Sequence, residues 1–141
     1  MNQLSQDVYW ALQDAYHSVK KNLHNKLADC GVSWPQYHAL YHIHEQGIPA
    51  NELARELNCN ASNMTGLIDR MIENNWVFRE HSVEDRRVWF VKLTDEGLKL
   101  KNQLVPQYRI SICEQMNVLN EEEQEILTDL LKKLTYQVLD K

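Results

Sequence analysis

Apolar residues recur at helical spacing along most of this chain. The first such segment runs from Leu4 to about Ala28, and Gly31 follows it in a position that favours the end of a helix. Ser33 and Gln36 have the spacing of a capping box, which predicts a second helix from about Trp34 to Glu45. The chain therefore opens with two helices joined by a short turn.

The next two segments have the pattern of a helix-turn-helix. A short helix is expected to begin at Pro49, and the polar residues Asn58 to Asn60 form a turn into the repeat Asn60–Asn75. We expect the apolar face of this repeat to comprise Met64, Leu67, Ile68, Met71 and Ile72. Its polar face is expected to comprise Ser62, Thr65, Gly66, Asp69, Arg70 and Glu73.

Two extended runs follow this repeat, Trp76–His81 and Val88–Leu93, and they flank the polar segment Ser-Val-Glu-Asp-Arg-Arg. The pattern predicts a β-hairpin whose loop carries Arg86 and Arg87. A helix with a small polar leading edge can enter the major groove of DNA while an Arg-tipped hairpin contacts the adjacent backbone or minor groove. These residues therefore outline a winged helix-turn-helix that binds double-stranded DNA.

Two further helices are expected after the hairpin. Thr94 caps a helix that continues past Pro106, where we expect a kink, towards Met116, and Asn120 and Glu123 form a second capping signal. The apolar stripe of the last helix is wider than a lone surface helix needs, and comprises Ile126, Leu127, Leu130, Leu131, Leu134 and Val138. The first and last helices are therefore expected to pack against a second copy.

The predicted fold is mostly α-helical, with four helices, two strands and two more helices in chain order. The 141 residues are expected to form a single domain. Within it, residues 33–93 form a winged helix-turn-helix lobe, and residues 1–30 and 95–141 form dimerisation helices.

Composition narrows the class of protein. The chain is 43% hydrophobic and 25% charged, as in an ordinary soluble globular protein. Neither a run of about 18 apolar residues nor a secretory leader is visible, so no membrane association and a cytoplasmic location are expected. The three cysteines, Cys30, Cys59 and Cys113, are widely spaced and are expected to be reduced and mostly buried.

The net charge of −5 is unusual for a protein that binds nucleic acid. Even between Pro49 and Leu93, six Lys and Arg face seven Asp and Glu. Contact with phosphate depends on charges within about 8–10 Å, however. The cations on elements expected to touch DNA are Arg70, Arg79, Arg86 and Arg87. The acidic total therefore predicts weak non-specific affinity for DNA.

The hairpin and the helix after it carry a recognisable motif. It consists of Asp85-x-Arg87, five intervening residues, and Leu93-Thr94-x-x-Gly97. With these residues the chain resembles the MarR family of bacterial transcription regulators over nearly its whole length. The resemblance implies a homodimer with interlocked terminal helices and two winged lobes on a near-palindromic operator. It also implies repression that a small molecule, an oxidant or a metal relieves.

Two departures from the family pattern affect the expectations. Asn75 stands where the family usually has glycine, and asparagine can adopt the same left-handed conformation. Val8, Tyr9 and Trp10 stand where the branch that senses organic hydroperoxides carries a reactive cysteine. Thiol-based sensing of that kind is therefore not expected.

The candidate DNA contacts lie on the helical repeat and the hairpin loop. Ser62, Asn63, Thr65 and Gly66 can reach base edges from the first turns of the repeat, although such residues also occur on any solvated face. Arg70 lies one turn further and could instead pair with Asp69 or Glu73. The resemblance implies that Arg87 enters the minor groove, that Asp85 orients the loop, and that Arg86 assists.

A second cluster suggests an effector cleft. His38 and His42 lie four residues apart on the second helix beside Tyr41, and Tyr16 adds aromatic surface. A small aromatic anion is the expected effector. A metal-sensing regulator is an alternative, but the histidine pair lacks a third ligand of recognised spacing, so neither a metal nor a cofactor is predicted. A winged helix that binds only proteins is a further alternative, whereas no enzyme motif is present.

Overall fold

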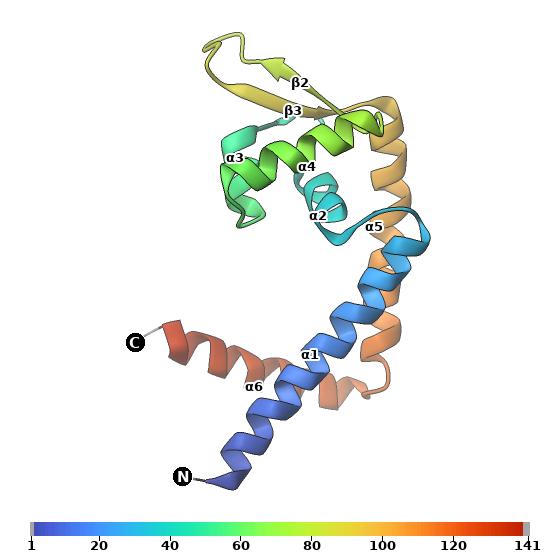
Figure 1. Ribbon diagram of the computed structural model, residues 1–141. Coiled ribbons are helices and arrows are strands. Elements are labelled where there is room, and N and C mark those ends of the chain that lie inside the picture. The colour runs from blue at the N-terminus through green and yellow to red at the C-terminus, as the bar shows by residue number, and fades with distance from the viewer. Residues whose placement is uncertain (1, 140–141) are drawn as a thin grey trace. The chain divides into compact units, whose positions relative to one another are not determined.

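The computed structural model describes residues 2–139, and the side chains of Val138 and Leu139 lie outside the described part (Figure 1). Its elements in chain order are α1 (Gln3–Asp29), α2 (Trp34–His42), β1 (Ile48–Pro49), α3 (Ala50–Glu56), α4 (Ala61–Glu73), β2 (Val77–His81), β3 (Trp89–Leu93), α5 (Asp95–Met116) and α6 (Glu121–Leu139). The mostly helical winged-helix fold predicted from the sequence is confirmed. Contacts group the chain into two compact units, Met1–Gln107 and Tyr108–Lys141.

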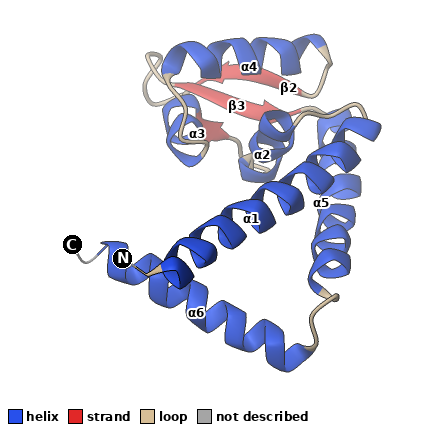
Figure 2. Ribbon diagram, turned by 60° about the horizontal axis from the view of Figure 1, so that its bottom comes forward, coloured by secondary structure: helices blue, strands red, loops and turns tan. Residues whose placement is uncertain are grey.

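The first unit is built around a small antiparallel sheet with strand order β1-β3-β2. Figure 2 shows α4 and α3 beside these strands, which are drawn in red. Side chains of α1 to α5 and of the sheet close the core, and the largest fully buried ones include Leu40, Ile43, Leu53, Met71 and Val91. The core therefore fixes α4 against the hairpin formed by β2 and β3.

Helix ends in this unit are fixed by side-chain caps, of which the capping box at Ser33 was predicted and the cap at Asn60 was not. The Ser33 side chain accepts a hydrogen bond from Gln36 N, and Gln36 returns one to Ser33 N, which completes the capping box of α2. Asn60 caps α4 by accepting from Asn63 N at 2.8 Å. Asn75 has a φ of 62°, so it adopts the left-handed conformation that the sequence predicted at the end of this helix.

Two details differ from the prediction. Helix α2 ends at His42 rather than near Glu45, because Ile43 is extended and its carbonyl accepts a 2.6 Å hydrogen bond from Lys101 Nζ on α5. Burial lowers the pKa of Lys101. Strand β1 was not predicted, since two residues show no alternation, and it pairs Ile48 with Val91 and Pro49 with Phe90.

The turn between α4 and β2 is fastened to the start of α5. Thr94 Oγ1 donates to Asn75 O at 2.6 Å and accepts from Gly97 N at 3.0 Å, which confirms Thr94 as the cap of α5. A Cβ atom at Gly97 would lie 1.9 Å from Trp76 O, so only glycine fits this contact. The Leu93-Thr94-x-x-Gly97 motif is thus a fastening between the hairpin and α5.

The second unit contains the end of α5 and the whole of α6. Asn120 and Glu123 form the predicted capping box, with 2.9 Å hydrogen bonds in both directions. Gln124 Nε2 donates to Met116 O and Leu119 O across the turn. The apolar residues Ile126, Leu127, Leu130 and Leu134 are exposed in the single chain. Val138, the last residue of the predicted stripe, has a side chain outside the described residues.

The expectation for the cysteines is wrong in one respect. All three thiols are free, but Cys30 and Cys113 are exposed and Cys59 is only half-buried. Both exposed cysteines lie near helix ends or on outward faces, where a small apolar side chain costs little in solvent. None of the helices in residues 2–139 is long and apolar enough to cross a membrane.

Candidate nucleic-acid interface

Helix α4 presents the two faces that its sequence predicts. Met64, Leu67, Ile68 and Met71 are buried, while Ile72 is half-buried. On the other face Ser62, Asn63, Thr65 and Arg70 are exposed, and Gly66 is half-buried. The Thr65 hydroxyl donates to Ala61 O at 2.9 Å, which leaves its oxygen lone pairs available. Residues with small hydrogen-bonding side chains therefore line the first turns of an anchored helix.

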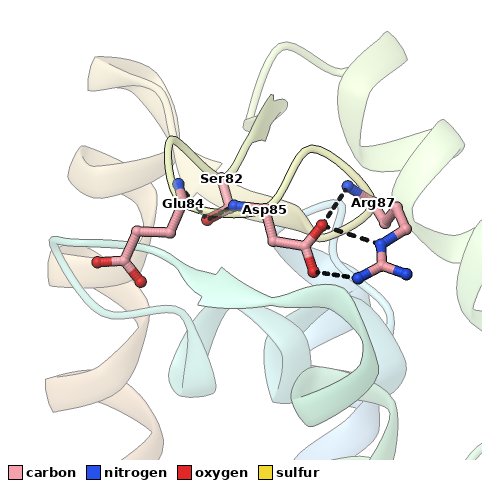
Figure 3. Close-up of polar contacts among 4 residues, drawn as sticks. All are labelled: Ser82, Glu84, Asp85 and Arg87. Carbon is pink, nitrogen blue, oxygen red and sulfur yellow. Dashed lines mark hydrogen bonds and ion pairs between the residues drawn. The ribbon is translucent and has the colours of Figure 1, made fainter.

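The hairpin loop is ordered by its own side chains. Ser82 Oγ accepts hydrogen bonds from Glu84 N at 3.2 Å and Asp85 N at 3.3 Å, and Asp85 O accepts one from Val88 N at 3.0 Å. These bonds form a turn that needs no contact with another element. Figure 3 shows Ser82 and Asp85 within this loop.

Asp85 then holds Arg87. Its carboxylate accepts from Arg87 N at 3.0 Å, Nε at 3.1 Å and Nη2 at 3.3 Å (Figure 3). The side-chain bond to Arg87, followed by the backbone bond, lowers the pKa of Asp85. The side chain of Arg87 is nevertheless 90% exposed, so one edge of the guanidinium is fixed while the rest faces solvent. Arg86 beside it is exposed and forms no ion pair with the described residues.

The cation on α4 is also available. Asp69 pairs with Arg79 of β2 at 2.6 Å, so one of the two acids that could have neutralised Arg70 is already engaged. Arg70 forms no ion pair with any residue in the described range. The Asp69–Arg79 pair was not predicted from the sequence, because its partners lie ten residues apart on different elements. It ties α4 to the hairpin.

A pocket of about 560 Å³ lies between α2 and α4. It is lined by Trp34, Pro35, His38, Leu57, Cys59, Ser62, Asn63, Gly66, Leu67 and Arg70. The pocket joins one residue of the predicted effector cleft, His38, to four of the predicted DNA contacts. A molecule inside it would touch the polar face of α4.

The histidines of α1 and α2 form an aromatic column. The ring of Trp34 lies between His24 at 5.1 Å and His38 at 4.9 Å, and His38 lies 4.9 Å from His42. Burial lowers the pKa of His24, with Lys20 adding to the effect. Burial also lowers the pKa of His38, and the charge of His42 adds to this while Glu56 opposes it. Sequence spacing placed His38 beside His42 but did not include Trp34.

Two members of the predicted cleft lie close together with His38, and one does not. Tyr41 contacts His42 edge-on at 5.2 Å. Tyr16 is exposed on α1, where Lys20 Nζ lies 4.9 Å from its ring, and it does not line the pocket. Within residues 2–139, no group of three or more His, Cys, Asp or Glu side chains is arranged to hold a metal ion.

Comparison with known proteins identifies the family to which this architecture belongs. Residues 32–89, which span the helices and hairpin described above, match the MarR family model. A MarR-like protein from Bacillus cereus is 28% identical and superposes with a TM-score of 0.84, covering 96% of this chain and 99% of its own. The chain belongs to the MarR family.

Other MarR-family matches extend over most of the chain. The HTH-type transcriptional regulator MhqR of Bacillus subtilis is 27% identical over 95% of this chain and 93% of its own length. Sco3205 of Streptomyces coelicolor, solved in complex with DNA, shares the fold with a TM-score of 0.81 and 23% identity, over 96% of this chain and 88% of its own. This member of the MarR family is therefore a transcription regulator with a winged-helix fold.

Proposed function

We propose that this protein is an effector-responsive repressor that binds a near-palindromic operator as a homodimer. The observation that carries the proposal is the pair of available cations on the two elements of the winged helix. Arg70 lies on α4 and forms no ion pair with the described residues, and Arg87 lies at the hairpin tip, held by Asp85. Arginine in these two positions can contact phosphate and the minor groove together.

Base recognition is assigned to the first turns of α4. Ser62, Asn63, Thr65 and Gly66 are small enough to let the helix approach base edges, and three of them carry hydrogen-bonding groups. Each lost base contact is expected to cost about 1–3 kcal/mol of discrimination. The net charge of −5 limits sequence-independent binding, so a larger share of the affinity must come from these contacts.

The homodimer follows from surface that a single chain leaves open. Leu4, Val8, Trp10 and Tyr16 on α1 are each at least half exposed, as are Ile126 and Leu130 on α6. A monomer rarely leaves so many large apolar side chains in contact with water on its terminal helices. We therefore assign residues 1–30 and 95–141 to a dimer interface, which would present two copies of residues 33–93 to a two-fold operator.

The effector site is proposed at the pocket between α2 and α4. His38 offers a hydrogen-bond donor and Arg70 offers positive charge to an acid, and Trp34 offers an aromatic surface. His42 and Tyr41 extend the same aromatic cluster on α2. Tyr16 lies on α1 and does not line this pocket. An occupant would compete with DNA for α4. Salicylate-like acids that leave the DNA affinity of wild type unchanged would contradict this assignment.

A winged helix that binds only proteins is the competing function. Such a protein would have no reason to leave Arg70 exposed on α4 and to hold Arg87 at the hairpin tip. The two functions are separated by one measurement, which is selection of binding sites from random double-stranded DNA. The repressor should return paired half-sites spaced by about one helical turn or a multiple of it. A single unpaired half-site, or no enrichment, would contradict the proposal.

Arg87→Ala tests the mechanism on the selected operator. We expect weaker binding with an unchanged melting temperature, because the 90% exposed side chain supports no buried group. If Arg87 neutralises one phosphate, the slope of log affinity against log salt concentration should fall by about one. Fluorescence anisotropy at several salt concentrations measures both effects.

Lys99→Ala serves as the matched control, because it removes another exposed cation from the first unit without touching α4 or the hairpin. An equal loss of affinity in both variants would show that only the total charge matters. In that case the hairpin would have no specific part in the mechanism.

A further inference from the structure

The hairpin carries an exposed aromatic pair that the proposed DNA contacts do not use. His81 and Trp89 face each other as the last rung of the β2–β3 ladder, immediately before the loop. Their ring centroids lie 3.5 Å apart at an interplanar angle of 32°. Both residues are exposed, and Trp89 retains 42% of its surface. The two rings thus form one continuous surface with polar N–H groups at its edge, beside the arginine loop that carries Arg86 and Arg87.

The register of the ladder places this pair on a defined face of the hairpin. Side chains alternate between faces along a strand, so His81 and Trp89 share a face with Arg79 and Val91, which form the rung two residues earlier. Arg79 on this face reaches Asp69 of α4, and Val91 is buried. The aromatic pair therefore continues the α4-facing side of the hairpin, which runs alongside α4 (Figures 1 and 2).

The position of the His81–Trp89 pair along the hairpin is equally informative. From the sheet outward, the order is Arg79 tied to α4, then the aromatic pair, then the loop with Arg86 and Arg87. When α4 occupies a major groove and the loop reaches the next minor groove, one DNA strand must cross between them. On the hairpin the aromatic pair lies between Arg79 and the arginine loop, and therefore beside the path that such a strand would take.

We propose that His81 and Trp89 bind the sugar-phosphate backbone of the operator strand that crosses between α4 and the hairpin loop. This inference rests on the proposed function. The indole N–H and an imidazole N–H can each donate to a phosphate oxygen, and the ring faces can cover a deoxyribose. The exposed Arg86 and the solvent-facing edge of Arg87 offer positive charge to a polyanion at this end of the hairpin, beside the acids Glu84 and Asp85 of the same loop.

The opposite face of the hairpin is less suited to DNA. It carries Glu80 and Lys92, which neutralise each other in a 2.6 Å ion pair. It also carries Phe78, which is 42% exposed, the same fraction as Trp89. The hairpin therefore provides a matched control, in which an equally exposed aromatic ring lies on the face turned away from α4.

The experiment compares Trp89→Ala with Phe78→Ala in operator binding by fluorescence anisotropy. We expect Trp89→Ala to weaken binding about tenfold, the effect of losing one hydrogen bond to a charged group. The loss should be similar for operator and unrelated DNA, because backbone contacts carry no sequence information. The salt slope should stay unchanged, since no cation is removed, and Phe78→Ala should bind as wild type does.

A second readout reports contact directly. Trp89 is one of four tryptophans, and its exposed ring should lose fluorescence when DNA covers it. We expect operator DNA to quench wild-type emission more strongly than Trp89→Phe emission, although phenylalanine keeps the ring contact with His81. Any quenching of Trp34, which lies beside the polar face of α4, is common to both proteins. A purely structural role for Trp89 would not produce this difference. Circular dichroism melting checks that each variant is folded, and His81→Ala carries the same binding expectation if Trp89→Ala does not fold.

The outcomes separate this inference from the function on which it rests. Wild-type protein that binds no DNA would overturn both. Wild-type binding with an unaffected Trp89→Ala variant would overturn the backbone contact alone. An equal loss in Phe78→Ala would also overturn it, since the effect would then come from the stability of the hairpin rather than from one face.

Discussion

Asp85 accepts three hydrogen bonds from Arg87, one from the backbone N–H and two from the guanidinium. Ser82 in turn accepts the backbone N–H of Asp85, so the carboxylate is itself held by the loop. An acid next to a DNA-binding cation has two opposing effects. It repels phosphate through its charge, and it restricts the cation to a geometry that reaches the groove.

Asp85→Ala distinguishes these two effects by sign. If repulsion dominated, removing a negative charge from a chain of net charge −5 would strengthen DNA binding. We expect the opposite, a loss of about threefold to tenfold, because Arg87 and the loop lose their common anchor. Anisotropy with operator DNA measures the change, and Glu84→Ala is the matched removal of a neighbouring exposed acid. Stronger binding by Asp85→Ala would contradict the positioning role.

Residues whose roles depend on near neighbours were predictable from the sequence. The caps at Ser33 and Thr94 were read from spacings of a few positions, and the left-handed Asn75 from the family resemblance, whereas the cap at Asn60 was predicted only as a turn. Roles that depend on pairing between distant elements were not. The ring contact of Trp34 with His24 on another helix follows only once the chain has folded. The assignment of Ser62, Asn63, Thr65, Gly66, Arg70, Arg86 and Arg87 to DNA stays a prediction.

At the scale of elements, helices were predicted better than strands. Helices of this chain carry a repeated apolar stripe and side-chain caps at their ends, and both signals are local. Strand β1 has two residues and exists because β3 offers a free edge, so no local signal marks it. The end of α2 was missed for a similar reason, since Lys101 arrives from α5 to hold Ile43 O.

Gly97→Ala tests the fastening between the hairpin and α5. A Cβ atom at this position would clash with Trp76 O, which is backbone and cannot move without disturbing the turn after α4. Overpacking of this kind costs typically about 1–3 kcal/mol. We expect the free energy of unfolding, measured by urea denaturation, to fall by at least that much.

The DNA-binding consequence of this change distinguishes the fastening from ordinary packing. If Gly97 sets how the hairpin approaches α4, folded Gly97→Ala protein at low temperature should also bind operator DNA more weakly. Leu98→Ala in the same turn of α5 is the control for a simple loss of packing at a half-buried position. Wild-type stability in Gly97→Ala would show that the backbone contact is not essential.

At the scale of the whole molecule, exposed apolar side chains and charged side chains are unevenly distributed among the described residues. The first turns of α6 carry Glu121, Glu122 and Glu123, far in sequence from the cations of α4 and the hairpin. No residue of α6 is buried in the single chain among those whose side chains are described. The sequence predicted this surplus of apolar surface from the width of the stripe, but a single chain cannot show its partner.

Leu130→Glu tests the proposed dimer without truncating the chain. Leu130 is 56% exposed, so in a monomer the substitution should change stability by no more than about 0.5 kcal/mol. In a dimer that buries Leu130, a charge would enter an apolar interface, and dissociation or a large loss of stability should follow.

Lys133→Glu, at another exposed position of α6, controls for the added negative charge. We expect wild type and Lys133→Glu to sediment as dimers with concentration-dependent melting, and Leu130→Glu to lose both properties together with operator binding. A wild-type monomer at micromolar concentration would contradict the dimer, and with it the two-fold operator that two copies of residues 33–93 would require.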